Sequence, residues 1–201
     1  YLRLLSGIDM AIGRVVKALE DRGLADNTII VYMADNGYMM GDRGMAGKWN
    51  HYEQSLRVPL IVYDPRVKQS RVEQRMALNI DLAPTFLDWA GAELPEQYQG
   101  RSLAGFVRGE EPAGWRNDFF CEHLMERAEI PKYEGVRGER YVYARYFEYG
   151  YEFLHDLQED PDELVNYTDH ADYADVLATM RARCDELRDA YGGPYESPVA
   201  G

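Results

Sequence analysis

The sequence is poor in cysteine, with two in 201 residues, Cys121 and Cys184. Two cysteines so far apart match no zinc-binding spacing, and they exclude the dense disulfide framework that stabilises many small secreted domains. One disulfide between them remains an open alternative, so cysteine usage leaves the redox compartment undecided. Cys184 falls within the helical pattern "LATMRARCDELRDA", which predicts a small packed side chain.

The sequence also lacks long apolar runs and is poor in positive charge. No apolar stretch reaches the roughly 18 residues that a transmembrane helix needs. Lys and Arg number 22 against 35 Asp and Glu, which gives a net charge of −13 at pH 7. An acidic surface of this size repels nucleic acid and anionic membranes, so we expect neither as the main partner. An anion site in this chain must therefore depend on local lysines or on a metal.

The first residues contain no signal peptide, no initiator methionine and no helix cap. Apolar residues at helical spacing from Leu2 to Leu19 predict a helix that lacks a start signal and ends near Gly23. From this beginning we expect the sequence to be a piece of a longer polypeptide.

Two short apolar runs flank a long loop in the first third of the chain. "NTIIVYMAD" (27–35) and "VPLIVYDP" (58–65) are continuous in apolarity, as strands covered on both faces are. The order helix, strand, loop, strand predicts an α/β fold with part of a doubly wound mixed sheet. "NIDLAPTFLDWAGA" predicts a further helix, which Asp81 caps and which ends at Gly91.

Aromatic residues dominate the last third of the chain. Tyr and Phe alternate over residues 139–157 and break at Tyr149-Gly150, which is typical of a hairpin. "ADYADVLATMRARCDELRDAYGG" predicts a terminal amphipathic helix that glycine ends. We therefore expect two parts joined by a Pro- and Gly-rich connection. Residues 1–115 form an α/β portion, and residues 116–201 form a small antiparallel sheet with a C-terminal helix.

Asp35-Asn36-Gly37 follows the first predicted strand directly. In open α/β sheets, ligands gather beyond the carboxyl ends of strands. A carboxylate and an amide oxygen are hard donors, which suit Ca²⁺ or Mg²⁺. The alternative is a tight turn, because Asn-Gly is a strong hairpin dipeptide, although the next strand begins only at Val58. The residues alone leave metal binding and a turn as open alternatives.

Three glycines lead into Lys48, at the end of a loop that suggests phosphate binding. The P-loop pattern fails, because Asp42 stands at its first glycine position and Trp49 at its Ser/Thr position. An ammonium group on a flexible stem can still hold a tetrahedral oxyanion. An exposed loop lysine is the alternative that these residues leave open.

Around these residues the sequence resembles type I sulfatases of the alkaline phosphatase superfamily. An apolar strand, Asp-Asn-Gly, a Gly-rich loop, Gly-Lys, Tyr-Glu and Arg-Val-Pro occur in order as "VYMADNG", "MGDRGMAGK" and "HYEQSLRVPLIVYDP". "GIDMAIGRVVKALEDRGLADNT", "DLAPTFLDWAGA", "GRSL", "EGVRGERYVYARYFE" and "HDLQEDPDELVN" agree as well, so the likeness covers nearly the whole chain. It implies an alkaline-phosphatase-like fold, hydrolysis of sulfate esters, and that residues 1–115 are the C-terminal part of the catalytic α/β domain.

The resemblance implies a metal site and a catalytic lysine. Asp35 and Asn36 would supply half of a Ca²⁺ site, with Mg²⁺ as the alternative ion. The metal polarises the sulfate oxygens. Lys48 would bind a sulfate oxygen and offset the charge that develops on the bridging oxygen.

Three further residues are candidate substrate contacts by the same resemblance. His51 follows Lys48 by about one helical turn and either lines the substrate pocket or forms hydrogen bonds within the loop. His123 follows a predicted strand and either contacts the alcohol part of the substrate or is a packed histidine. Arg43 stands where many members carry histidine, which leaves its contact with substrate open. Glu53 and Arg57 are predicted to pair and to fix the loop.

The sequence lacks the motif that carries the nucleophile of this family. These sulfatases use a formylglycine made within Cys/Ser-x-Pro-x-Arg, and no cysteine or serine here has that context. We expect the formylglycine in a missing N-terminal part of the same polypeptide, and the 201 residues alone to be inactive. A sulfated small molecule or sulfated sugar is the expected substrate. A phosphate or phosphonate ester hydrolase and a non-catalytic metal- or partner-binding domain are the alternatives.

Overall fold

The computed structural model describes residues 1–126 and 130–195, and the chain forms two compact units. The first unit consists of Tyr1–Ala34 and Pro59–Ala113. The second consists of Asp35–Val58 and of the chain from Gly114 onward. The long loop between the two apolar runs is thus grouped with the C-terminal residues.

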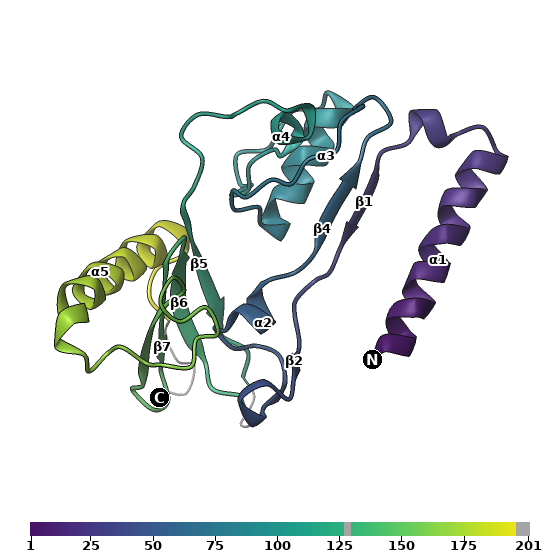
Figure 1. Ribbon diagram of the computed structural model, residues 1–201. Coiled ribbons are helices and arrows are strands. Elements are labelled where there is room, and N and C mark those ends of the chain that lie inside the picture. Colours follow the sequence, from purple (N-terminus) through teal and green to yellow (C-terminus); the bar gives the residue numbers. More distant parts are fainter. Residues whose placement is uncertain (127–129, 196–201) are drawn as a thin grey trace. The chain divides into compact units, whose positions relative to one another are not determined.

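The first unit is built from helices and one pair of strands (Figure 1). β1 and β4 pair antiparallel, with Ile30 opposite Tyr63 and Met33 opposite Leu60, as a mixed sheet allows. The elements are α1 (Leu2–Asp21), η1 (Ala25–Asn27), β1 (Ile30–Met33), β4 (Leu60–Tyr63), η3 (Asn79–Asp81), α3 (Leu82–Ala90) and α4 (Ala104–Arg108).

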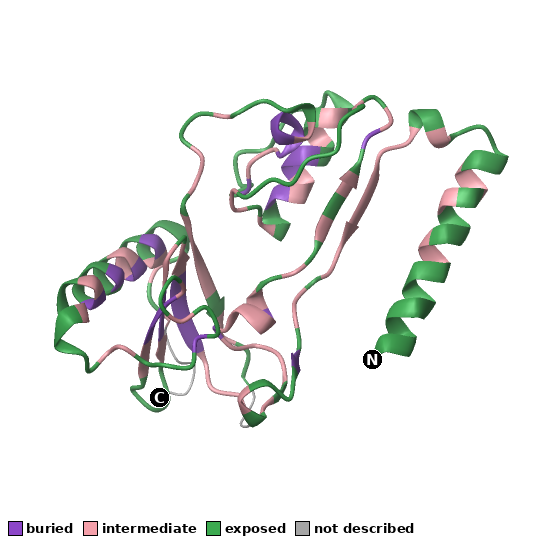
Figure 2. Cartoon of the chain, in the orientation of Figure 1, coloured by how far each residue is buried: buried purple, intermediate pink, exposed green. Residues whose placement is uncertain are grey.

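Much apolar surface of the first unit is exposed. α1 has no buried residue, and Ile61 and Tyr63 on β4 are exposed (Figure 2). The expectation of strands covered on both faces is therefore wrong for β4 in the described chain, whereas all four residues of β1 are partly buried. No helix among residues 1–126 and 130–195 has the length and apolarity to cross a membrane.

α3 ends at Gly91, whose φ of +65° is the left-handed conformation expected of a C-cap. At the other end Asp81 stands at the N-cap position, as predicted, but its side chain makes no capping hydrogen bond to α3. The buried Asp81 carboxylate accepts the backbone N–H groups of Leu78 and Arg101, at 2.8 Å each, instead of capping the helix. A Cβ added at Gly100 would lie 2.0 Å from a backbone carbonyl oxygen. The glycine of "GRSL" thus permits this close approach of two chain segments.

The second unit is a four-stranded antiparallel sheet in the order β5-β6-β7-β8 (Figure 1). β7 and β8 form the predicted hairpin, and Gly150 in their turn has a φ of +63°. The elements are β2 (Met39–Met40), η2 (Asp42–Gly44), β3 (Ala46–Gly47), α2 (Glu53–Leu56), β5 (Asp118–His123), β6 (Tyr133–Gly138), β7 (Tyr141–Tyr146), β8 (Glu152–Asp156), η4 (Ala171–Tyr173) and α5 (Ala174–Tyr191).

α5 packs on one face of this sheet and closes the main core of the unit. Cys184 is fully buried there, as predicted, and both cysteines are free thiols. The core side chains come from three strands and from one stripe of the helix: Val136, Tyr143, Leu154, Leu177, Met180, Cys184 and Leu187.

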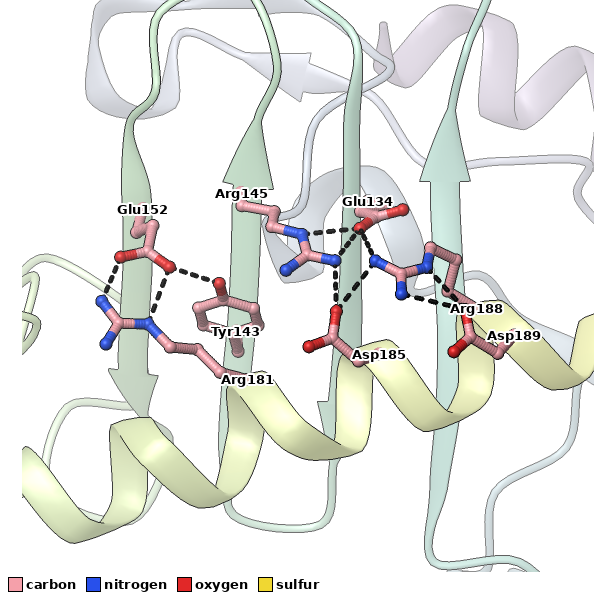
Figure 3. Close-up of polar contacts among 8 residues, drawn as sticks. All are labelled: Glu134, Tyr143, Arg145, Glu152, Arg181, Asp185, Arg188 and Asp189. Atoms are coloured by element: carbon pink, nitrogen blue, oxygen red, sulfur yellow. Dashed lines mark hydrogen bonds and ion pairs between the residues drawn. The ribbon is translucent and has the colours of Figure 1, made fainter. Parts of the chain in front are cut away.

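A charged network joins α5 to the same face (Figure 3). The buried Glu134 carboxylate on β6 accepts from Arg145 Nε at 2.6 Å, and Arg188 Nη1 lies 3.7 Å away. Asp185 on α5 accepts from both guanidinium groups, at 2.6 and 2.8 Å. A carboxylate buried this deeply would be costly alone, so the two arginines offset its desolvation and fix the position of the helix.

Candidate functional site

Three of the predicted site residues come together at the start of the second unit. Asn36 Oδ1 accepts a hydrogen bond from Lys48 Nζ at 2.9 Å, and Asp35 Oδ2 lies 3.9 Å from the same nitrogen. The side chain of Asp35 is 85% exposed, whereas that of Lys48 is 29% exposed. The structure thus places the lysine and both oxygen donors in one cluster, the Asp35–Asn36–Lys48 cluster.

The backbone after Asn36 is held by a close approach to α2. Gly37 N–H donates to the carbonyl of Ser55 at 2.9 Å, and a Cβ added at Gly37 would lie 2.0 Å from the carbonyl oxygen of Gln54. Only glycine fits there. β1 pairs with β4 and not with a strand directly after Gly37, so the hairpin-turn alternative for Asp35-Asn36-Gly37 is wrong.

The two oxygen donors fit a divalent cation in their chemistry. An accessible carboxylate and an adjacent amide oxygen are ligands of the type that Ca²⁺ and Mg²⁺ take, and the approach of the Lys48 ammonium shows that positive charge is favourable there. Within the described chain no three His, Cys, Asp or Glu side chains gather into a metal-binding group. Asp35 and Asn36 would therefore be part of a shell that Ca²⁺ completes with about six to eight oxygens.

His51 lies inside the unit, with 1% of its surface exposed. Its Nδ1 is 2.8 Å from the hydroxyl of Tyr146, and its Nε2 is 3.1 Å from Nε2 of His155. Burial, followed by the nearby charges of His155 and Arg43, holds the pKa of His51 well below its usual range. The two alternatives for His51 were a residue that lines the substrate pocket and one that forms hydrogen bonds within the loop. Its contacts favour a structural role in holding the loop, but the residues that it bonds lie on the sheet and not in the loop.

Tyr146, His51, His155 and the carbonyl of Val165 form a row of hydrogen bonds. The direction of each bond follows from the carbonyl of Val165 at the end of the row. His155 Nδ1 lies 2.8 Å from the carbonyl of Val165, which can only accept, so Nδ1 carries the proton. Burial lowers the pKa of His155, and its neutral ring then accepts at Nε2. His51 Nε2–H must donate to it, which leaves His51 Nδ1 to accept from Tyr146. A single polarised chain thus ties the loop after Lys48 to β7 and β8.

Arg43 is tied to the connection after β8. Its Nη1 donates to Gln54 Oε1 at 3.0 Å, its Nη2 donates to the carbonyl of Asp162, and its guanidinium lies 4.1 Å from the ring centre of Tyr52. The residue has a φ of +55°, which a non-glycine residue rarely adopts. The same Nη2 lies 3.7 Å from Glu163. These contacts are all with the chain's own residues.

Glu163 is a buried residue that sequence reasoning missed. Its Oε2 accepts the backbone N–H of Glu53 at 2.9 Å, and burial raises its pKa to about 7. The Glu53 carboxylate pairs with Arg137 on β6 at 2.9 Å, so the predicted pair of Glu53 with Arg57 is wrong. The side chain of Glu53 turns toward the sheet, whereas Arg57 is exposed. The feature of the sequence that could have indicated Glu163 is its place in "HDLQEDPDELVN", one of the segments that carry the family resemblance.

His123 ends β5, and its ring stacks on Trp49 with centroids 5.5 Å apart. Trp49 follows the predicted lysine, and Lys48 Nζ is 5.3 Å from its ring centre. The backbone N–H of Trp49 donates to Ser55 Oγ at 3.0 Å. This bond holds the backbone of Trp49 at a φ of +73° and thereby sets the position of the indole. Trp49 therefore links Lys48 to His123, a role that the sequence pattern did not indicate.

Known proteins resemble this chain in sequence and in fold. Residues 41–190 match the family model described as N-sulphoglucosamine sulphohydrolase, C-terminal. An N-acetylglucosamine-6-O-sulfatase of Bacteroides thetaiotaomicron is 33% identical over 95% of this chain and 35% of its own length.

Two solved structures show the same fold. One, described as a complex with its substrate D-glucosamine-2-N,6-O-disulfate, has a TM-score of 0.89 at 32% identity, covering 95% of this chain and 40% of that one. The phosphonate monoester hydrolase SpPMH of Silicibacter pomeroyi has a TM-score of 0.87 at 31% identity, with coverage of 95% and 40%.

The chain spans 35 to 40% of the length of these three relatives. The predicted alkaline-phosphatase-like α/β fold, with its small antiparallel sheet and C-terminal helix, is confirmed. The chain belongs to the sulfatase family of the alkaline phosphatase superfamily, in which it corresponds to the C-terminal portion.

Proposed function

We propose that the protein containing these residues hydrolyses sulfate esters and that its substrate is a sulfated sugar. The observation that carries this proposal is the Asp35–Asn36–Lys48 cluster, in a chain of the sulfatase family. The sugar part of the proposal is supported by relatives whose names or titles specify sulfated glucosamine derivatives.

The cluster divides the chemistry between a metal and a lysine. Asp35 and Asn36 would hold Ca²⁺, with Mg²⁺ as the alternative, and the bound ion supplies Lewis-acid polarisation of the sulfate oxygens. Lys48 has three N–H donors, of which one reaches Asn36 within the described chain. The other two donors would bind a sulfate oxygen and the bridging oxygen, whose charge grows as the S–O bond breaks.

The other predicted contacts fall into two groups. His123 and Trp49 form a stacked aromatic pair beside Lys48, which suits contact with the sugar that carries the sulfate. His51 and Arg43 are proposed to act through the loop, because their polar groups bind the sheet and the connection after β8. They position Lys48 without touching the substrate.

The nucleophile is proposed to be a formylglycine from another part of the polypeptide, since these 201 residues contain no Cys/Ser-x-Pro-x-Arg motif. Phosphonate ester hydrolysis is the second candidate. It is favoured by the similarity to the phosphonate monoester hydrolase, and the same lysine and metal would serve a phosphoryl group.

The test measures hydrolysis of 6-O-sulfated N-acetylglucosamine, 4-nitrophenyl sulfate and a phenyl phosphonate ester by the protein from its whole reading frame. We expect hydrolysis of the sulfated sugar, and a loss of about 10²- to 10³-fold in kcat for Lys48→Ala, as for removal of one donor to a developing oxyanion. Lys17→Ala is the matched control, because that side chain is 72% exposed on α1. Faster turnover of the phosphonate would favour the second candidate, and an unchanged kcat in Lys48→Ala would contradict the role of the lysine.

A further inference from the structure

The first unit contains a cavity of about 640 Å³ that none of the predicted site residues lines. Its walls come from the segment after β4, from the last turn of α3 and from the end of α4. The charged side chains in these walls are Asp64, Arg66, Lys68, Arg71, Asp88 and Arg108. This feature is called the β4–α3 cavity below.

The β4–α3 cavity has the opposite charge to the rest of the protein. Four of its lining residues are cationic and two are carboxylates, which gives 4 − 2 = +2 in a chain of net charge −13. A concave positive surface concentrates field lines and attracts anions even when the surrounding surface repels them. The cavity is therefore a place where an anion can bind without the help of a metal.

Two of the four cationic side chains already form ion pairs with neighbouring carboxylates. Arg66 binds both oxygens of Asp64, through Nε at 2.8 Å and Nη2 at 2.7 Å, so that this pair is neutral as a whole. Arg108 donates to Glu110 at 2.7 and 3.0 Å. Asp88 accepts from Ser102 Oγ at 2.5 Å.

Lys68 and Arg71 are the two cationic side chains of the cavity that remain available to bind an anion. Within residues 1–126 and 130–195 neither side chain forms an ion pair, and Lys68 Nζ donates only to the carbonyl of Pro65, at 3.1 Å. The Arg71 guanidinium lies against Gly109, where an added Cβ would come within 2.3 Å of Nη1. After these pairs the walls keep two cationic side chains, Lys68 and Arg71, against the single carboxylate of Asp88, and the glycine leaves room for Arg71.

Trp89 adds an aromatic wall to these two cations. Its ring lies 6.0 Å from that of Phe86, and its buried Nε1–H has no acceptor in the described chain. Sulfate or carboxylate groups match the cations, and a sugar ring matches the face of an indole. The volume lies within the range of about 300 to 1,000 Å³ typical of sites for small ligands, and it exceeds what a single sulfate ion fills.

We propose that the β4–α3 cavity is a second saccharide site, which binds a sulfated or carboxylated sugar of a glycan chain. Lys68 and Arg71 hold the anionic groups, and Trp89 contacts the ring. The choice of a sugar as the ligand depends on the proposed sulfatase function, whereas the binding itself needs no turnover. Such a site would favour substrates with several sulfated sugars over single ones.

The test is direct binding of a heparin-derived tetrasaccharide to the whole protein by calorimetry, in a Lys48→Ala background that weakens binding at the catalytic site. We expect about tenfold weaker binding when Lys68→Ala and Arg71→Ala are combined, since each exposed charge contact contributes a factor of a few. The matched control combines Arg14→Ala and Lys17→Ala on exposed positions of α1, and removes the same charge. This control should bind within about twofold of the parent protein.

Four further measurements distinguish saccharide binding in the cavity from a folding defect and from unspecific attraction of anions. Lys68→Arg combined with Arg71→Lys should retain binding, because the charge is kept, which excludes a mere folding defect. With Lys48 intact, hydrolysis of 4-nitrophenyl sulfate should be unchanged by the two alanines. The proposal is overturned if the tetrasaccharide binds the alanine variant as tightly as the parent, or if an uncharged tetrasaccharide or a single-stranded DNA binds equally well. Failure to hydrolyse any sulfate ester would refute the proposed function and leave this binding result intact.

Discussion

Replacing Glu163 by glutamine tests how the loop that carries Lys48 is held. Glu163 is 2% exposed, and burial raises its pKa from 4.5 to about 7, although the positive charges of Arg43 and Arg137 oppose the shift. A raised pKa in the folded state means that the native protein binds a proton more tightly than the unfolded chain. This carboxylate therefore lowers the stability of the protein when it is ionised.

The sign and the size of the change in unfolding free energy with pH follow from this pKa shift. The contribution of Glu163 to the stability should be highest below pH 4.5, fall as the pH rises from 4.5 to about 7, and stay level above. At about 1.4 kcal/mol for each pKa unit, the total loss is about 3 kcal/mol. Glutamine resembles the protonated acid at every pH. The Glu163→Gln variant should match the wild type near pH 4 and exceed its free energy of unfolding by about 2 to 3 kcal/mol at pH 8.

The assay is urea unfolding of wild type and variant at several pH values between 4 and 8, followed by tryptophan fluorescence. Glu159→Gln is the matched control, because that side chain lies in the same connection and is 57% exposed. It should change stability by less than about 1 kcal/mol at any pH. A Glu163→Gln variant that is less stable than the wild type at pH 8 would refute the reasoning, since it would show that the attraction to Arg43 outweighs burial.

Three other substitutions test the site. Gly37→Ala should destabilise the protein by about 2 kcal/mol in urea unfolding and displace the loop, because its Cβ would lie 2.0 Å from the carbonyl of Gln54; an unchanged unfolding curve would contradict the close approach. Tyr146→Phe leaves His51 Nδ1 without its donor and should cost about 1 to 2 kcal/mol in the same assay, a result that a neutral variant would overturn. Asp35→Ala should weaken Ca²⁺ binding at least about tenfold by calorimetry, and a chelator should abolish hydrolysis by the whole protein; equal Ca²⁺ affinity would exclude Asp35 as a ligand.

Local features of the fold were predictable because they depend on neighbours in the sequence. The hairpin turn at Gly150 and the helix end at Gly91 depend on left-handed glycines. The cluster of Asp35, Asn36 and Lys48 was predictable from the order of motifs in a known family. Pattern alone left each of these three residues with an ordinary structural alternative.

Contacts between distant segments were not predictable in the same way. The predicted pair of Glu53 and Arg57 used helical spacing, but the partner of Glu53 is Arg137, 84 residues further along the chain. The spacing of His51 from Lys48 suggests a pocket residue, yet its contacts depend on which face of a later sheet it meets. Strand register and the side of a sheet that a loop covers do not appear in local periodicity.

The discontinuous second unit also has a consequence for the order in which the protein folds. The loop Asp35–Val58 binds side chains that come about a hundred residues later, as in the contacts of His51 with His155 and of Glu53 with Glu163. During synthesis, this loop leaves the ribosome long before β8 does, so its contacts with His155 and Glu163 can form only after β8 and the connection that follows it have been made. Contacts of such long separation form slowly. A polypeptide that stops before β8 would keep Lys48 but would lack His155, the β8 partner of His51 in the same loop.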